Sequence, residues 1–328
     1  MDPVAALLEI ATLLERERAS RYRAKAFRQA AATVQDLPDD VLNDPTRLRA
    51  TKGIGESTFA VIRQAQAAMT PDYLVELRGE VEPERTSLLR AKLRGDLHAH
   101  TDWSDGTTSI STMAEAARAL GHEYLAITDH SPRLRVARGL SAERLREQVP
   151  LVRAESTENF TLFAGIEVDI LDDGTLDQEA ELLSALDIVV ASVHSKLRME
   201  ARPMTARMIA AVKNPHVNVL GHCTGRLVQG DRGTRPPSQF DAQAVFDACA
   251  ENGVAVEINA RPERQDPPDE LIAIALYAGC LFSLDSDAHA PGQLSLLDYG
   301  AERAEKAGVP AERIVTTWGV DRLRAWAE

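Results

Sequence analysis

Residues 124–130 read Tyr-Leu-Ala-Ile-Thr-Asp-His, an apolar run of strand length that ends on polar side chains. Short apolar runs of this kind are typical of strands buried in a parallel sheet. The pattern recurs from residue 93 onward, with helical stretches between the runs. The predicted strands are 93–98, 124–128, 161–167, 187–193, 217–221, 254–258 and 281–285, and the helices between them include 109–120, 141–155, 203–213, 241–252 and 269–278.

This alternation of strands and helices predicts a parallel α/β architecture. Seven such units fit a barrel better than an open sheet, although the count alone leaves both open. We expect a large domain over residues 93–328, a linker over 81–92 and a small all-α domain over 1–80. A chain of 328 residues is long enough for one large and one small hydrophobic core.

Six of the eight histidines stand at or just after the predicted strand ends, together with three carboxylates. In βα barrels the carboxyl ends of the strands form the active site, so we expect these side chains to lie together. A single histidine there would more often be an ordinary hydrogen-bonded residue, but six with three carboxylates favour a metal site. The nine candidate ligands are His98, His100, Asp105, His130, Glu167, His194, His222, Asp287 and His289.

The composition excludes several other classes of protein. With 44% hydrophobic and 27% charged residues, the chain has the composition of a soluble globular protein. Its three cysteines show no pattern of a disulfide framework or a structural zinc site. No segment approaches the ~18 apolar residues of a membrane span, and the charged N-terminal residues do not predict a secretory signal. We therefore expect a cytoplasmic protein without membrane contact.

Charge is divided unevenly along the chain. Residues 1–95 carry 15 basic and 14 acidic side chains, a net charge of +1. Because the whole chain has a net charge of −13, the remaining residues carry a net charge of −14. An acidic body repels nucleic acid on average, and bound divalent cations would reverse this locally.

Residues 51–57, Thr-Lys-Gly-Ile-Gly-Glu-Ser, place two glycines around an apolar residue between helical stretches. Such a turn exposes backbone amides at the start of the next helix, where a phosphate oxygen can dock. The segment resembles the helix-hairpin-helix of DNA-repair proteins, and a glycine-capped hairpin without a binding role is the alternative. The predicted nucleic-acid-binding residues are Arg23, Lys25, Lys52, Gly53, Ile54 and Gly55.

Over residues 4–80 the chain resembles the small N-terminal domain of bacterial family X DNA polymerases, through residues 22–28, Leu37-Pro38, the Gly-Ile-Gly turn and Tyr73-Leu74. In some relatives this domain is also a deoxyribose-phosphate lyase, with a Schiff-base lysine in the helix after the hairpin. Val61 occupies that place here, and no lysine lies between Lys52 and Lys92. We expect no lyase activity, because the helix offers no amine nucleophile; borohydride trapping on an abasic site tests this.

The strand-end series His-x-His, Thr-Asp-His, Gly-x-Glu, Ser-x-His, Gly-His and Asp-x-His resembles the polymerase and histidinol phosphatase (PHP) superfamily over residues 93–328. The match is nearest to the C-terminal domain of family X polymerases. The resemblance implies a distorted seven-stranded βα barrel with a trinuclear metal centre. It implies one metal on His98, His100, Glu167 and Asp287, a second on Glu167, His194 and His222, and a third on Asp105, His130 and His289.

The implied activity is that of a metal-dependent phosphoesterase, in which two or three ions of Zn, Mn or Fe activate a hydroxide that attacks phosphorus in line. The catalytic residues would be His98, His100, Glu167, His194 and Asp287. Candidate phosphate-binding residues are Arg135, Lys196, Arg226 and Arg261, for which a solvated loop charge is the alternative and, for Arg261, the favoured one. Asp129, next to His130, is a candidate to orient an imidazole.

Three functions stay open at this point. The chain is a DNA nuclease acting on 3′ ends or abasic sites, a small-molecule phosphatase of the histidinol phosphatase type, or a non-catalytic DNA-binding adaptor. The hairpin domain favours the first function, and the complete ligand set argues against the third. The short segment between Leu77 and the first strand cannot hold a nucleotidyl-transfer domain, so we expect no polymerase activity; nucleotide addition in a primer-extension assay would contradict this.

Overall fold

The computed structural model describes residues 1–17, 21–80, 87–230 and 233–328. The chain divides into two compact units, Met1–Glu84 with Pro291–Gln293, and Arg85–Ala290 with Leu294–Glu328. Of the predicted linker 81–92, residues 81–86 lie outside the described residues. Leu89, also within that range, packs into the core of the second unit. The boundaries 80/81 and 92/93 remain predictions.

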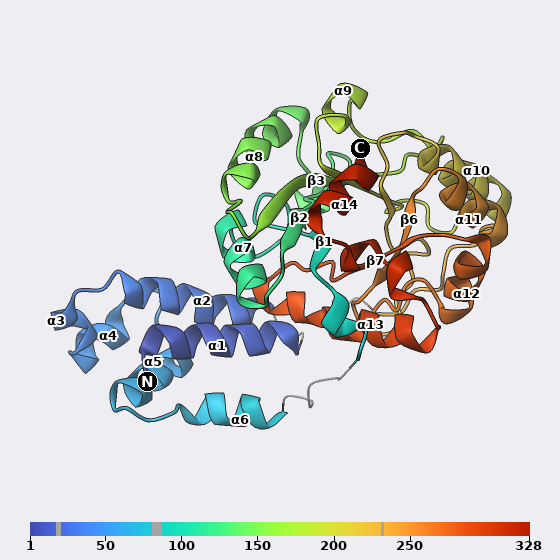
Figure 1. The fold of residues 1–328 in the computed structure, drawn as a ribbon. Coiled ribbons are helices and arrows are strands. Elements are labelled where there is room, and N and C mark those ends of the chain that lie inside the picture. Colours follow the sequence, from blue (N-terminus) through green and yellow to red (C-terminus); the bar gives the residue numbers. More distant parts are fainter. Residues whose placement is uncertain (18–20, 81–86, 231–232) are drawn as a thin grey trace. The chain divides into compact units, whose positions relative to one another are not determined.

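The described part of the first unit is helical (Figure 1). Asp2 caps its first helix, since the Asp2 carboxylate accepts the Ala5 N–H at 2.7 Å. Val61, at the position where the resemblance places the Schiff-base lysine of some relatives, is 2% exposed and packs in the apolar core of this unit. The helices are α1 (Pro3–Arg16), α2 (Arg21–Gln35), α3 (Asp39–Leu42), α4 (Pro45–Ala50), α5 (Glu56–Gln66) and α6 (Asp72–Glu80).

The predicted hairpin joins α4 to α5. Gly53 has a φ of +95°, and a Cβ at this position would lie 3.0 Å from Thr33 Oγ1 on α2. The left-handed backbone and this close approach both favour glycine. Ile54 packs into the core of the unit, while Gly55 caps the start of α5.

The second unit contains seven parallel strands in sequence order, each hydrogen-bonded to the next. The predicted α/β barrel is confirmed, and every strand matches its predicted range to within two residues. Among the described residues, a backbone bridge between Ala99 and Ala288 joins β1 to the chain after β7 and nearly closes the barrel. The strands are β1 (Gly95–Ala99), β2 (Tyr124–Ile127), β3 (Thr161–Asp169), β4 (Ile188–Ser192), β5 (Val219–Leu220), β6 (Ala255–Asn259) and β7 (Phe282–Asp285).

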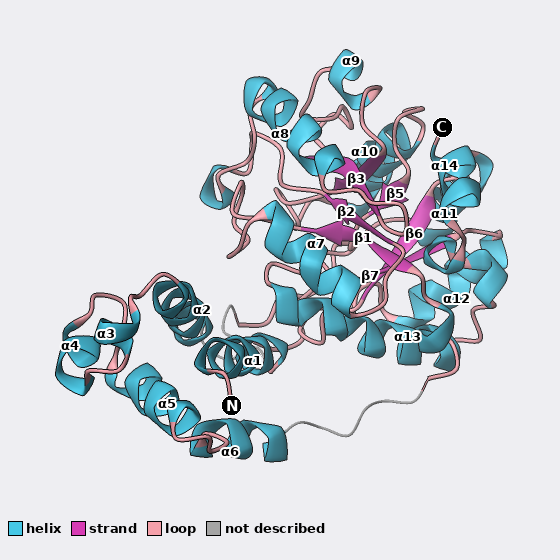
Figure 2. Cartoon of the chain, turned by 60° about the vertical axis from the view of Figure 1, so that its left-hand side comes forward, coloured by secondary structure: helices cyan, strands magenta, loops and turns pink. Residues whose placement is uncertain are grey.

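Helices surround these strands, as Figure 2 shows in cyan and magenta. The strands are buried almost throughout, because parallel strands in a barrel are covered on both faces. No described helix combines the length and the hydropathy needed to cross a lipid bilayer. The α-helices are α7 (Ile110–Ala119), α8 (Ala142–Ala154), α9 (Ala180–Leu183), α10 (Ala201–Val212), α11 (Ala242–Glu251), α12 (Asp269–Ala278), α13 (Leu297–Lys306) and α14 (Val320–Ala327), with short 3₁₀ turns η1 (Arg90–Lys92), η2 (Arg135–Ala137), η3 (Pro291–Leu296), η4 (Ala311–Arg313) and η5 (Val315–Thr317).

Two buried carboxylates join β1 to β7 where the backbone ladder is interrupted. Asp285 Oδ1 accepts the Leu97 N–H at 2.9 Å, and Asp96 accepts the Ser286 N–H at 3.2 Å. Burial raises the pKa of Asp96 to about 6. The pKa of Asp285 is raised well above its usual range by burial and by the nearby charge of Asp96. These hydrogen bonds align the ends of two strands that carry candidate ligands.

Candidate metal centre

All nine predicted ligands lie at the carboxyl ends of the barrel strands. His98 and Glu167 belong to β1 and β3, and the other seven follow β1, β2, β4, β5 and β7. Their ligand atoms form four groups, each with all atoms within 4.8 Å of one another, and the described residues of these groups are the nine and no others. The groups are His100, Asp105, His130 and His289; His98, His100 and Asp287; His98, Glu167 and His222; and His130, Glu167 and His194.

The carboxylate of Glu167 is the centre of this arrangement. It is 1% exposed and contacts five of the six clustered imidazoles with its two oxygens. The ion-pair distances are 2.8 Å from Oε1 to His222 Nε2, 3.1 Å from Oε1 to His194 Nε2, 2.7 Å from Oε2 to His130 Nδ1, 3.4 Å from Oε2 to His98 Nε2 and 3.6 Å from Oε2 to His100 Nε2.

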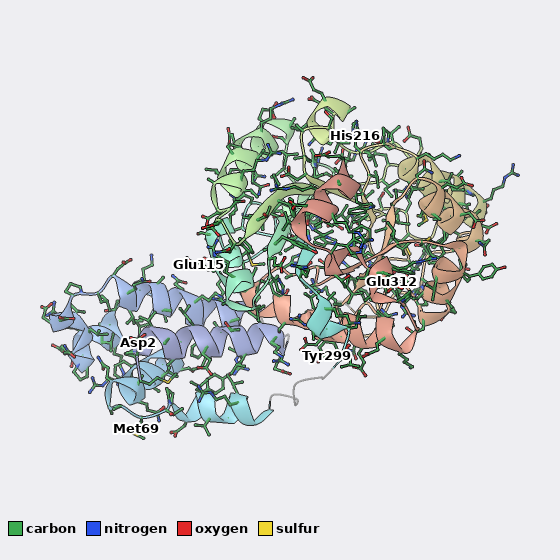
Figure 3. All side chains as sticks on the ribbon, viewed as in Figure 1. Asp2, Met69, Glu115, His216, Tyr299 and Glu312 are labelled. Carbon is green, nitrogen blue, oxygen red and sulfur yellow. The ribbon has the colours of Figure 1, made fainter. Side chains whose placement is uncertain are left out.

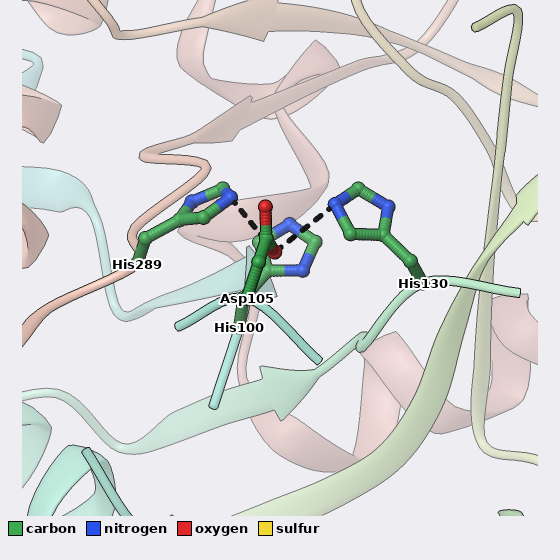
Figure 4. Close-up of side chains that lie close together, drawn as sticks. All are labelled: His100, Asp105, His130 and His289. Atoms are coloured by element: carbon green, nitrogen blue, oxygen red, sulfur yellow. Dashed lines mark ion pairs between the residues drawn. The ribbon is translucent and has the colours of Figure 1, made fainter. Parts of the chain in front are cut away.

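A second carboxylate, Asp105, lies between the imidazoles of His130 and His289 (Figure 4). Asp105 Oδ1 lies 3.3 Å from His289 Nε2 and 3.4 Å from His130 Nε2. The ring of His100 lies beside both imidazoles, with centroids 4.4 Å from His130 and 4.2 Å from His289. His130 therefore lies between Glu167 and Asp105, rather than in the third group alone as the resemblance implies.

Local contacts hold the loop that carries Asp105. Asp129 accepts the Thr101 N–H at 2.8 Å, the Ser104 O–H at 2.5 Å and the Gln148 side-chain N–H at 2.5 Å. The expectation that Asp129 orients an imidazole is therefore wrong, because its hydrogen bonds go to the loop after β1 and to α8. At Gly106 a Cβ would lie 2.7 Å from the backbone of His100 and Thr101, so glycine permits this loop to fold tightly.

The donor set fits divalent cations. Several buried nitrogen and oxygen atoms of the cluster have no hydrogen-bond partner, although they lie at ion-pair distances from one another. Buried polar atoms without partners are costly, and lone pairs that converge on one point are what a cation requires. These atoms are His98 Nε2, His100 Nδ1 and Nε2, Asp105 Oδ1, His130 Nδ1, Glu167 Oε1 and Oε2, both ring nitrogens of His194, and His222 Nδ1.

Strong mutual electrostatics accompany this burial. Burial raises the pKa of Glu167, but the imidazoles of His194, His130 and His98 lower it well below its usual range. Burial lowers the pKa of His130, but Glu167 and Asp105 raise it to about 10. Burial and the imidazoles of His289 and His130 lower the pKa of His100 well below its usual range. Without cations, protons on part of the cluster balance the carboxylates.

The four predicted phosphate-binding residues differ in what they already contact. Lys196 forms an ion pair with Asp172, and Arg226 Nε donates to the Gln265 carbonyl at 2.9 Å. Arg261 is 13% exposed and donates to Glu263 Oε1 at 2.9 Å and to the Asp287 carbonyl at 3.1 Å. Only the exposed side chain of Arg135, among these four, makes no hydrogen bond or ion pair with a described residue.

The predicted nucleic-acid-binding residues lie on α2 and on the α4–α5 hairpin. Arg23 contacts Tyr73, whereas the exposed side chains of Lys25 and Lys52 make no hydrogen bond or ion pair with a described residue. The Gly55 N–H donates to Thr58 Oγ1 at 2.9 Å, so this hairpin amide is already partnered. The backbone N–H groups in the first turn of α5 have no carbonyl of a preceding helical turn to accept their hydrogen bonds, and they remain candidates for phosphate binding.

Sequence reasoning missed several residues that contact the ligands, among them Asp169, which lies 3.4 Å from His194 Nδ1. Glu257 and Asn259 on β6, and Arg264 after it, hydrogen-bond to His98 or Asp287. The available signal was Glu257 and Asn259 at alternate positions of an otherwise apolar strand. Two histidines lie outside the four groups, as predicted. They are His122, whose pKa burial lowers to about 4, and His216, which lies between α10 and β5 in the sequence and is labelled in Figure 3.

Chelation tests whether cations occupy this cluster. A ligand at about 100 times its Kd stabilises the folded state by about 2.7 kcal/mol, which shifts the Tm of a domain of this size by about 5–10 °C. We therefore expect EDTA followed by buffer exchange to lower the Tm by about that amount, and added Zn²⁺ or Mn²⁺ to restore it. Differential scanning calorimetry measures both steps, and an unchanged Tm would contradict the expectation.

Comparisons with known proteins agree with these two parts. The profile of the PHP domain matches residues 96–261, and that of a helix-hairpin-helix domain matches residues 1–69. DNA polymerase/3′-5′ exonuclease PolX of Bacillus subtilis is 35% identical over 263 residues, which are 79% of this chain and 45% of PolX. A probable phosphatase of Vibrio parahaemolyticus is 30% identical over 233 residues, which are 68% of this chain and 88% of the phosphatase.

Among solved structures, histidinol phosphate phosphatase of Lactococcus lactis, in complex with Zn, L-histidinol and phosphate, is similar with a TM-score of 0.48 and 19% identity. The match covers 66% of this chain and 94% of that one. The chain thus spans slightly less than half the length of PolX and most of the length of the phosphatase relatives.

Proposed function

This chain belongs to the PHP domain family of metal-dependent phosphoesterases, and from that premise we propose that it hydrolyses DNA phosphodiesters, as a 3′–5′ exonuclease or as an enzyme that processes 3′ ends or abasic sites. The observation that carries the proposal is the combination of the two parts. One chain holds a barrel with a nine-residue donor cluster and a helical unit that matches a helix-hairpin-helix domain. The DNA polymerase/3′-5′ exonuclease PolX of Bacillus subtilis aligns with 79% of the chain.

In the proposed reaction, the clustered side chains would bind the metal ions and balance their charge. The nine clustered side chains would hold two or three divalent ions, such as Zn, Mn or Fe, by imidazole nitrogens and carboxylate oxygens. When bound, such ions supply Lewis acidity toward phosphoryl oxygens and lower the pKa of bound water to about 7. Glu167 would neutralise cation charge from the centre of the cluster, and Asp105 and Asp287 from its edges.

A small-molecule phosphatase of the histidinol phosphatase type is the second candidate function. It is favoured by the probable phosphatases among the relatives, which align over most of their own length. The same donor cluster suits either substrate, because in both reactions water attacks phosphorus and an alcohol oxygen leaves. The helical unit distinguishes the candidates, since a metabolite phosphatase has no evident use for a DNA-binding hairpin.

A paired assay in Mn²⁺ tests the proposal. The full chain is incubated with a 3′-recessed DNA duplex and, separately, with histidinol phosphate. We expect release of nucleotides from the duplex, and loss of that release in His100→Ala. Phosphate release from histidinol phosphate, without any cleavage of DNA, would overturn the proposal in favour of the second candidate.

Arg135 offers a sharper test of substrate contact at the mouth of the barrel. It lies in η2, on the loop that begins at His130 and returns where the Leu140 N–H donates to the His130 carbonyl at 2.7 Å. A hydrogen bond from a guanidinium to a phosphate contributes about 1.5–3 kcal/mol, so we expect Arg135→Ala to raise KM for DNA roughly tenfold or more with little change in kcat. Steady-state kinetics measures this, and Arg146→Ala, on the exposed face of α8, is the matched control.

A further inference from the structure

Strand β6 supplies none of the nine candidate ligands, yet two of its side chains contact them. Glu257 and Asn259 stand two residues apart, so they project from the same face of the strand. Both are completely buried. A carboxylate buried beside metal ligands needs partners, and those of Glu257 are parts of the cluster itself.

Glu257 contacts ligand segments from two other strands. Its Oε1 lies 2.6 Å from His98 Nδ1, and its Oε2 accepts the backbone N–H of His222. Because an ionised carboxylate only accepts hydrogen bonds, the proton of this contact lies on His98 Nδ1. A neutral His98 with its proton on Nδ1 keeps the lone pair of Nε2 for a cation, and Nε2 lies 3.4 Å from Glu167 Oε2 without a hydrogen bond.

Asn259 extends the contact to a third ligand. Its side-chain nitrogen lies 3.2 Å from Glu257 Oε2 and 3.2 Å from Asp287 Oδ2. Arg264 Nε donates to the same Asp287 oxygen at 3.0 Å. The other oxygen, Asp287 Oδ1, faces His100 Nε2 at 3.5 Å. Asp287 Oδ2 is therefore held by Asn259 and Arg264, whereas Oδ1 faces His100 and Arg261.

We propose that Glu257 is a positioning residue of the metal centre. It holds His98 in the tautomer that presents Nε2 to a cation, and Asn259 links this arrangement to Asp287. The proposal rests on the metal-dependent function proposed above, but not on the identity of the substrate. Partners of this kind orient metal ligands, and their loss costs about 10–100-fold in metal affinity.

Glu257→Gln tests the proposal because glutamine cannot satisfy all the partners of the carboxylate. Two N–H donors, from His222 and Asn259, face the Oε2 position, so the amide oxygen is expected to turn toward them. The amide nitrogen then donates to His98 Nδ1, which places the ring proton on Nε2. That tautomer cannot bind a cation through Nε2.

The measurement uses the full chain and Mn²⁺, with the free ion followed by its electron paramagnetic resonance signal. We expect Glu257→Gln to bind at least one Mn²⁺ about 10–100-fold more weakly than the unmodified chain. In the protein loaded with diamagnetic Zn²⁺, long-range ¹H–¹⁵N correlation spectra should show a proton on His98 Nδ1 in the unmodified chain and no proton there in the variant.

Asp187→Asn is the control for loss of a structural carboxylate. Asp187 directly precedes β4, at the opposite end of the strands, and accepts the Ala164 N–H at 2.8 Å. We expect this variant to lose stability but to keep its Mn²⁺ affinity. Should Glu257→Gln fail to fold, Asn259→Ala carries the same test, with a smaller loss of affinity in the same direction.

The outcomes separate this inference from the proposed function. Equal Mn²⁺ affinity in the folded variant and the unmodified chain would overturn the role of Glu257 and leave the DNA substrate unaffected. Mn²⁺ binding by the unmodified chain without DNA cleavage would overturn the substrate and leave Glu257 in its role. Absence of Mn²⁺ binding by the unmodified chain would overturn both.

Discussion

Replacing Glu167 by glutamine is expected to reduce turnover by more than about 100-fold and to remove at least one metal ion per chain. The loss should exceed that caused by removing a residue which only orients a ligand, about 10–100-fold. Glu167 belongs to two of the four ligand groups, and its oxygens face five imidazoles. The amide removes the negative charge and replaces one acceptor oxygen with an N–H donor, so both groups lose their only carboxylate.

Elemental analysis after gel filtration and single-turnover kinetics on DNA measure the two effects together. The matched control is Glu123→Gln. Glu123 directly precedes β2, at the amino end of the strands, where it pairs with Arg94 at 2.6 Å. The control should keep the metal content of the unmodified chain. A Glu167→Gln variant that is folded and retains both metal and turnover would contradict the assignment of this cluster as the catalytic centre.

Reversing two charges of the helical unit is expected to weaken DNA binding by about tenfold or more at ~0.1 M salt. The slope of the logarithm of the binding constant against the logarithm of the salt concentration should also become shallower by about one for each lost phosphate contact. The residues are Lys25 and Lys52. Both are exposed, and neither is paired with a described residue. Lys25 precedes Gln29 by one turn on α2, and Gln29 and Thr33 are the residues that approach Gly53. The two lysines therefore flank the hairpin turn.

Fluorescence anisotropy with a labelled duplex over a range of salt concentrations measures both quantities for Lys25→Glu, Lys52→Glu and the double variant. Arg78→Glu is the matched control, since Arg78 lies on α6 and is already paired with Glu9 at 2.7 Å. If the control weakens binding as much as the hairpin variants do, the effect is one of net charge. If none of the variants changes binding, the hairpin is a structural turn.

The resemblance stated from the strand-end residues is confirmed by the family match, and the barrel with its helical N-terminal unit is confirmed by the structure. These were accessible because the signals are local. A strand of four to nine residues shows its burial in its own sequence, and a parallel strand places its last residues at one edge of the sheet. The presence of nine donors at one rim followed from that rule alone.

Contacts between side chains distant in sequence were not accessible in this way. Arg261 reads as a loop cation, but the fold also brings the distant Asp287 within 3.7 Å of it, in addition to its near neighbour Glu263. Asp129 reads as a partner of the neighbouring histidine, but its hydrogen bonds go elsewhere. Both outcomes depend on which side chains the fold brings near Arg261 and Asp129. An arginine that is already paired with a carboxylate binds a phosphate less strongly than an unpaired one.

The sequence by itself determined the order of strands and helices, the types of donor at the strand ends and the family. Only the tertiary structure decided which imidazole meets which oxygen, that Glu257 holds His98, and that Asp96 and Asp285 join the first strand to the last. The physical reason is that hydrophobic periodicity is written along a few consecutive residues. The partners of a buried charge, by contrast, are set by the register and closure of the whole barrel. Here closure brings Asp285 to Leu97, 188 positions away in the sequence, and Asp96 to Ser286, 190 positions away.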